Sequence, residues 1–129
     1  MSSCIEQSCT ESQTKINPVA APYTPQFEDQ MNVIIEEKVP VFSFTFGMLS
    51  EHWVKKLKER GVYIIGTATT LTEARLLEAH QVDAIVAQGR EAGGHRGTFI
   101  GKAEDAVIDV ASLVKQLLEH LKLPIIAAG

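Results

Sequence analysis

Residues 62–88 read VYIIGTATTLTEARLLEAHQVDAIVAQ, and this stretch decides the fold class. Val62–Ala68 and Ala84–Gln88 are short apolar runs rich in β-branched residues, which predicts two strands. Between them, Thr70-x-x-Glu73 is a capping-box signature and predicts the start of a helix. A strand, a helix and a second strand in this order imply parallel pairing through a right-handed crossover.

The same alternation continues on both sides of this stretch. Val41–Phe46 predicts an earlier strand, and Ser50 is a suitable cap for a helix that runs to Arg60. Downstream, Ile125–Ala128 predicts a last strand, and before it an apolar stripe at helical spacing comprises Val110, Leu113, Val114, Leu117, Leu118 and Leu121. About four parallel strands with intervening helices indicate the α/β class. They form either a small open sheet or a partial (β/α)8 TIM barrel, since a complete barrel needs eight strands and roughly 250 residues.

Residues 1–30 differ from the rest of the chain. Ser, Thr, Gln and Pro dominate there without any apolar period, which predicts an irregular polar tail ahead of one barrel segment at 31–129. A short helix is expected over residues 31–38. Cys4 and Cys9 lie in the tail, where reduced thiols are the main interpretation and a disulfide is the alternative. A lone cysteine pair cannot fill a tetrahedral shell, so no metal site is expected.

The composition is that of an ordinary soluble domain, with 45% apolar residues and a net charge of -4. The absence of a basic footprint argues against nucleic acid as the main partner. No apolar run approaches the roughly 20 residues that span a bilayer, and no secretory signal is visible. We therefore expect a cytoplasmic protein without a membrane partner.

In parallel α/β folds, ligands bind at the carboxyl ends of the strands. Here these ends carry glycine, threonine or both, at Phe46-Gly47, Gly66–Thr70, Gln88–Gly97 and Ala127–Gly129. Glycines let a backbone approach a ligand closely, and exposed N–H groups suit phosphate. The third end also supplies Gln, Glu, His and Arg, so it is the main candidate site.

Strand alternation predicts which side chains face this site. Phe42, Phe44 and Phe46 share one face of their strand and are expected to pack on helices. Ser43 and Thr45 would then point into the barrel, with Thr45 near its mouth.

The histidines fall into two groups. His95 lies between glycines in the third loop and is either a solvated loop residue or a functional group. His52, His80 and His120 lie on predicted helices, where a structural or solvent-facing role is expected.

From about residue 39 to Gly129, the chain resembles the nitronate monooxygenase (2-nitropropane dioxygenase) family. The residues that carry the resemblance are Val41–Gly47, Gly66–Thr70, Ala87–Gly89 with Glu91–Gly97, and Ile125–Gly129. The stretch Glu-Ala-Gly-Gly-His-Arg-Gly at 91–97 is the most specific of these motifs. The resemblance implies an FMN-dependent barrel that oxidises alkyl nitronates with dioxygen.

The resemblance also implies roles by position. Gln88 would hydrogen-bond the isoalloxazine ring, Gly93 and Gly94 would contact the cofactor through their backbone, and Gly129 would begin the glycine turn that receives the phosphate. His95 would face flavin and substrate, either as a positive or hydrogen-bonding partner of the nitro group or as an acid–base group.

The first motif departs from the pattern of some members, which carry a histidine there as the catalytic base. This chain has Thr45 at that position. A threonine hydroxyl donates a hydrogen bond but is a poor base at neutral pH. The expected substrate is therefore the already anionic nitronate rather than a neutral nitroalkane.

The family's barrel begins with a strand and a Gly-Met-rich turn upstream of this sequence, and it needs a further strand after Gly129. We therefore expect a fragment that is not active alone. Two alternatives stay open, namely a related flavin barrel such as an enoyl-acyl-carrier-protein reductase, and a catalytically dead remnant that acts as an interaction module. An open arc would expose sheet edges and an apolar surface, which favours association, and homo-oligomerisation is left open.

Overall fold

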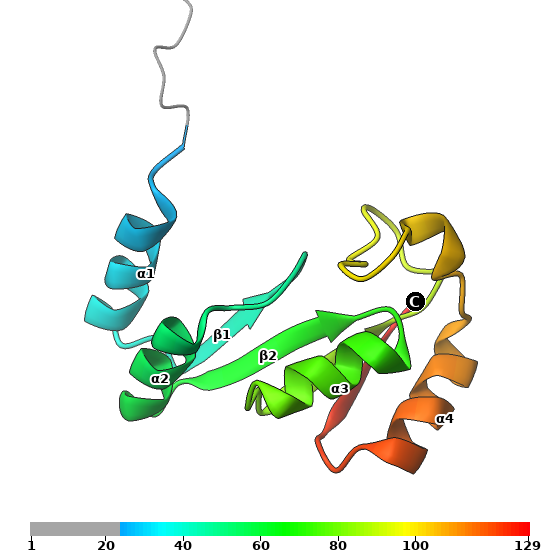
Figure 1. The fold of residues 1–129 in the computed structure, drawn as a ribbon. Helices are drawn as coiled ribbons and strands as arrows, with labels where there is room; N and C mark the ends of the chain where they lie inside the picture. Colours follow the sequence, from blue (N-terminus) through cyan, green and yellow to red (C-terminus); the bar gives the residue numbers. More distant parts are fainter. Residues whose placement is uncertain (1–23) are drawn as a thin grey trace, which may run out of the picture.

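The computed structural model describes residues 24–129, so the predictions for residues 1–23, including both cysteines, lie outside the described part. In that part, helices and strands alternate along the chain (Figure 1). The elements are α1 (Phe27–Glu36), β1 (Val41–Phe44), α2 (Glu51–Glu59), β2 (Tyr63–Ala68), α3 (Leu71–Ala79), β3 (Ala84–Gln88), the 3-10 turn η1 (Ala103–Asp105), α4 (Val110–His120) and β4 (Ile125–Ala128). None of the helices in residues 24–129 is long and apolar enough to cross a membrane.

The four strands are parallel and pair in the order β1-β2-β3-β4. Because parallel crossovers are right-handed, an unbroken consecutive order places all the connecting helices on the same face of the sheet. A doubly wound open sheet would instead reverse its strand order at a switch point. The strand order therefore selects the arc of a (β/α)8 barrel over the open sheet, a choice that periodicity alone does not make.

The core lies between the sheet and the helices that cover it. Leu57 of α2, Leu77 of α3 and Leu113 of α4 are fully buried against Ile64 of β2 and Ile85 of β3. Each such side chain contributes about 1.5–3 kcal/mol when it leaves water. This core holds the strand ends in place beneath the candidate site.

Strand β1 is shorter than predicted: it ends at Phe44, whereas the predicted strand ended at Phe46. Phe42 and Phe44 pack on the core as expected, but Phe46 is 62% exposed and has a φ of 66°. The prediction that Phe46 shares their helix-covered face is wrong. A left-handed residue turns the chain, so the two-residue alternation of the strand stops before Phe46.

Two other boundaries differ from expectation. Helix α1 begins at Phe27, inside the predicted irregular tail, and the Phe27 ring meets Trp53 edge-on with centroids 6.5 Å apart. That aromatic contact comes from α2 and is not visible in local sequence pattern. In α4, Leu118 belongs to the predicted apolar stripe but is 63% exposed. The face of α4 that packs on the sheet is narrower than the face that carries apolar side chains.

Asp109 is the N-cap residue of α4, and its carboxylate makes the stability of this helix depend on pH. The Asp109 carboxylate accepts a hydrogen bond from the Ser112 N–H at 2.9 Å, and this bond is the main reason why the pKa of Asp109 lies below its ordinary 3.8. Because the folded-state pKa is depressed, the cap stabilises the fold above the unfolded-state pKa. That contribution is lost as the pH falls through the folded-state value.

We therefore expect Asp109→Ala to lower the unfolding temperature at neutral pH, with the gap to wild type closing in strong acid. Asp109→Asn is the matched control, because it keeps the cap acceptor but does not titrate. Thermal unfolding over a pH series measures both. An alanine gap that persists unchanged in acid would show that the charge is not involved.

Candidate functional site

Gln88, at the carboxyl end of β3, holds the loop that follows this strand. Its Nε2 donates to the His95 carbonyl at 3.0 Å, and its Oε1 accepts from the Gly97 N–H at 2.6 Å. A Cβ placed on Gly97 would lie 3.4 Å from Gln88 Oε1 and 3.6 Å from Thr45 Cγ2. Thr45 and Gln88 therefore lie around Gly97, and Gln88 also holds the backbone of His95. In this arrangement both polar atoms of Gln88 are bonded to the loop itself.

His95 lies exposed in the loop that follows β3, and this loop stands beyond the strand tips in Figure 1. The ring of Phe46 lies 6.4 Å from the His95 ring, centroid to centroid, at an interplanar angle of 85°. This is an edge-to-face contact in the normal range for aromatic pairs. Phe46 thus contacts the candidate site through its ring, whereas the sequence analysis assigned this side chain to the helix-covered face. The turn signal of Phe46-Gly47 was the available indication.

Phe46 also adopts an unfavourable backbone conformation. For a residue other than glycine, the left-handed region costs roughly 1–2 kcal/mol. Such conformations persist where surrounding contacts hold them, and they cluster at functional sites. The strained turn points the Phe46 ring toward His95 and away from the helix-covered core.

Gly93 and Gly94 leave their backbone open to approach. A Cβ on either residue would meet no atom within 4 Å, and Gly94 has a φ of 78°, which favours glycine. These glycines directly precede the exposed His95. The open backbone of these glycines and the exposed imidazole are therefore neighbours in the loop.

Gly129 has a different environment from these two glycines. A Cβ on Gly129 would lie 3.2 Å from Val110 Cβ and 3.4 Å from Glu91 Oε2. The same Glu91 oxygen accepts from the Val110 N–H at 3.0 Å, at the start of α4. A phosphate that contacts Gly129 would therefore meet a carboxylate on the α4 side.

Arg96 holds the loop after β3 in place through hydrogen bonds to backbone carbonyls. Its guanidinium donates to the carbonyls of Gly89, of Gln88 at 3.4 Å and of Ala106 at 2.7 Å. These bonds join the end of β3 to the segment that leads into α4. The Arg96 side chain is half-buried, and backbone carbonyls engage its guanidinium.

Glu73 is a second residue that sequence reasoning did not place in the site. The predicted cap is confirmed, since Thr70 Oγ1 accepts from the Glu73 N–H at 3.3 Å. However, the Glu73 carboxyl group does not return to the Thr70 N–H as in a standard capping box. It is fully buried and bonds instead to Thr69 and to Phe99 and Ile100 of the loop after β3.

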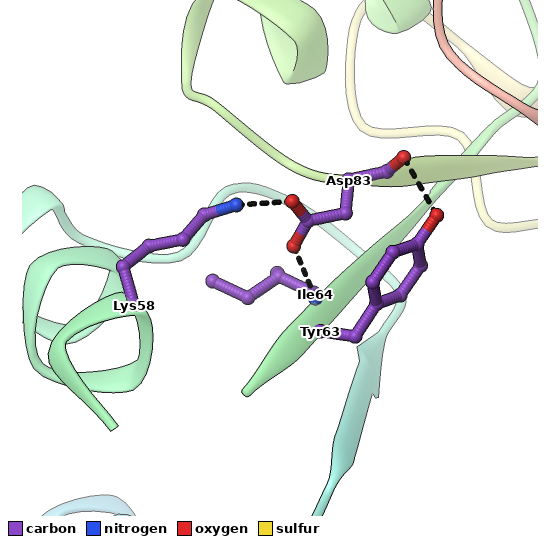
Figure 2. Close-up of polar contacts among 4 residues, drawn as sticks. All are labelled: Lys58, Tyr63, Ile64 and Asp83. Carbon is purple, nitrogen blue, oxygen red and sulfur yellow. Dashed lines mark hydrogen bonds and ion pairs between the residues drawn. The ribbon is translucent and has the colours of Figure 1, made fainter. Parts of the chain in front are cut away.

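A separate polar cluster lies at the amino ends of the strands (Figure 2). Asp83 pairs with Lys58 of α2 and accepts from the Ile64 N–H at 2.7 Å, while the Tyr63 hydroxyl donates to the Asp83 carbonyl at 3.0 Å. In barrel folds, this end of the sheet is associated with stability and not with catalysis. We therefore interpret the cluster as a structural link between α2, β2 and β3.

A groove of about 650 Å³ lies between α2 and the end of α3, lined by Glu51, Val54, Lys55, Lys58, Glu59, Ala79, His80 and Gln81. It is on the helix side of the sheet and contains none of the predicted site residues. The groove is therefore separate from the candidate site, which we place at the loops by the chemistry of their side chains.

Consecutive parallel strands with helices on one face, and a glycine-rich loop with a histidine at their carboxyl ends, are the arrangement of the (β/α)8-barrel enzyme class. The comparisons with known proteins give the family. The chain belongs to the nitronate monooxygenase family, whose model matches residues 3–129. This confirms the family to which the sequence motifs pointed.

Individual relatives agree with this assignment. A probable nitronate monooxygenase of Staphylococcus saprophyticus is 44% identical over 106 residues, which cover 81% of this chain and 30% of the relative. Among solved structures, the nitroalkane oxidase of Streptomyces ansochromogenes matches with a TM-score of 0.74 and 39% identity, over 78% of this chain and 30% of that one. A variant of FabK from Thermotoga maritima matches with a TM-score of 0.67 and 32% identity, over 84% and 33%. The chain thus spans about a third or less of the length of these proteins.

Proposed function

We propose that the protein takes part in the FMN-dependent oxidation of alkyl nitronates by dioxygen, with the loop after β3 as the flavin-facing element. The observation that carries this proposal is the hold of Gln88 on the backbone of His95, which follows the open backbone of Gly93 and Gly94. Membership of the nitronate monooxygenase family supports it.

The loop fits a flavin better at some positions than at others. The open backbone of Gly93 and Gly94 allows a ring to approach, and the exposed His95 offers a donor next to it. Gln88 orients the loop through one bond from each of its polar atoms, so its amide nitrogen keeps a second N–H for an isoalloxazine ring. A phosphate next to Gly129 would need to lie away from Glu91.

When bound, FMN supplies the electron-accepting chemistry, and the chain's own residues position the substrate and handle charge. His95 would hold the nitro group, either as a positive or hydrogen-bonding partner or as an acid–base group. Thr45 would offer a hydroxyl at the mouth of the site. Because that hydroxyl is a poor base, we propose that the substrate is the anionic nitronate and not the neutral nitroalkane.

A titration of FMN with the purified protein tests the cofactor proposal. We expect saturable quenching of flavin fluorescence at micromolar concentrations. Gly93→Val should weaken binding about tenfold, or roughly 1.4 kcal/mol, because a side chain there would stand in the open approach. Ala103→Val is the control, since it adds bulk at another exposed position of the same connection. Equal affinities of the two variants, or no binding of wild type at millimolar FMN, would contradict the proposal.

The two alternatives predict other results. A reductase that acts on enoyl thioesters would consume a reduced nicotinamide in the presence of such a substrate and would leave nitronates unchanged. An interaction module would bind no flavin. It would self-associate instead through the exposed strand side chains Val41, Tyr63 and Ile126, which are 49%, 40% and 44% exposed.

A further inference from the structure

We propose that Glu73 is a positioning residue that sets the place of the His95 loop. Its two oxygens bond to two different segments. Oε2 accepts from the Thr69 N–H at 2.7 Å and from the Thr69 hydroxyl at 2.8 Å, at the end of β2. Oε1 accepts from the N–H groups of Phe99 at 2.7 Å and Ile100 at 3.0 Å, in the loop after β3.

The carboxyl group of Glu73 is buried, and hydrogen bonds occupy both of its oxygens. Glu73 and Thr69 are both 0% exposed, and the Thr98 hydroxyl lies 2.8 Å from the Thr69 hydroxyl. Since the Thr69 hydroxyl donates to Glu73, it accepts from Thr98. A buried carboxyl group is costly unless its acceptors are filled, and here donors surround both oxygens. The N–H groups of Phe99 and Ile100 therefore offset part of the free-energy cost of burying the Glu73 side chain.

Glu73 and Gln88 hold the loop on either side of Thr98. Gln88 bonds the backbone of His95 and Gly97, and Glu73 bonds that of Phe99 and Ile100. Between them they fix the segment next to His95 to the ends of both β2 and β3. A positioning error of about 1 Å in a reacting group can cost roughly a hundredfold in rate. An effect of Glu73 on the reaction rate rests on the proposed function of His95. An effect of Glu73 on the position of the loop does not.

Two substitutions separate positioning from general stability. Glu73→Met keeps an unbranched side chain of similar length but removes every acceptor. Glu73→Gln keeps one oxygen, so at least one backbone N–H loses its partner because an amide nitrogen cannot accept. Glu78→Met is the matched control, since Glu78 is on the same helix and accepts from the Lys122 N–H at 3.1 Å, away from the loop.

The test is hydrogen exchange and proton NMR on the full chain without flavin. In Glu73→Met we expect exchange at Phe99 and Ile100 to accelerate about tenfold or more over the Glu78→Met control, with the strand amides of β2 and β3 unchanged. We also expect loss of the nuclear Overhauser contact between the rings of His95 and Phe46. Glu73→Gln should show an intermediate effect, and it decides the question if the Met variant does not fold.

A lowered unfolding temperature with the loop amides and the His95–Phe46 contact unchanged would overturn the proposal, because it would indicate a stabilising role only. In protein that binds flavin, the expected catalytic result is a fall in kcat of about tenfold or more with little change in KM. Failure of wild type to bind FMN would reject the proposed function. The exchange result would still decide the role of Glu73.

Discussion

Within an active full-length enzyme, replacement of His95 by alanine is expected to lower turnover of an alkyl nitronate by about a hundredfold or more, the usual scale for a positioned acid–base group. His95 is exposed on the loop after β3, next to the open backbone of Gly93 and Gly94. Its backbone carbonyl is held by Gln88 at 3.0 Å, so the alanine variant should keep the loop in place. The loss would therefore come from the missing imidazole and not from a displaced loop.

Steady-state kinetics at saturating FMN measure this effect. His120→Ala is the matched control, because His120 lies in the last turn of α4 and its ring bonds the Gln116 carbonyl at 2.8 Å. We expect the control to retain wild-type turnover. Equal turnover of the His95 variant and wild type would remove His95 from the mechanism.

Gly89→Ala is expected to destabilise the fold by about 3 kcal/mol, at the upper end of the usual cost of overpacking. A Cβ at Gly89 would lie 2.5 Å from Val110 Cβ and 2.6 Å from the Val110 backbone nitrogen. Because one of these atoms is helix backbone, α4 itself would have to move away from β3. Gly89 also donates to the Ala128 carbonyl at 2.9 Å, so the shift would strain the pairing with β4.

Denaturant unfolding measures the free energy of each variant. Gly93→Ala is the control from the same loop, since a Cβ there would meet no atom within 4 Å. Its expected effect is within about 0.5 kcal/mol, as for most surface substitutions. Similar free energies of unfolding for the two variants would show that α4 does not pack on Gly89 as described.

Much of the fold could be predicted from local pattern. β3 and β4 begin and end where β-branched runs indicate them, at Ala84–Gln88 and Ile125–Ala128. The cap at Thr70 was predictable because its donor is only three residues away. The position of the glycine-rich loop at the carboxyl end of β3 was predictable because this loop directly follows the strand in the sequence.

Residues whose partners lie far along the chain could not be placed in this way. Glu73 has the sequence signature of a local cap, yet two of the four hydrogen bonds to its carboxyl group come from Phe99 and Ile100. Arg96 bonds the Ala106 carbonyl at 2.7 Å, a partner that the local sequence pattern does not indicate. Phe46 continues the apolar alternation of its strand, but its left-handed turn brings it to His95.

The sequence by itself determined the alternation of strands and helices, the family and the location of the candidate loop, because each depends on the order and spacing of neighbouring residues. Only the tertiary structure decided the consecutive strand order of a barrel arc, the bracing of the loop by Glu73 and Arg96, and the meeting of Phe46 with His95. The physical reason is that hydrogen bonds and ring contacts between distant segments depend on where packing places those segments. Local propensity and periodicity carry no information about that placement.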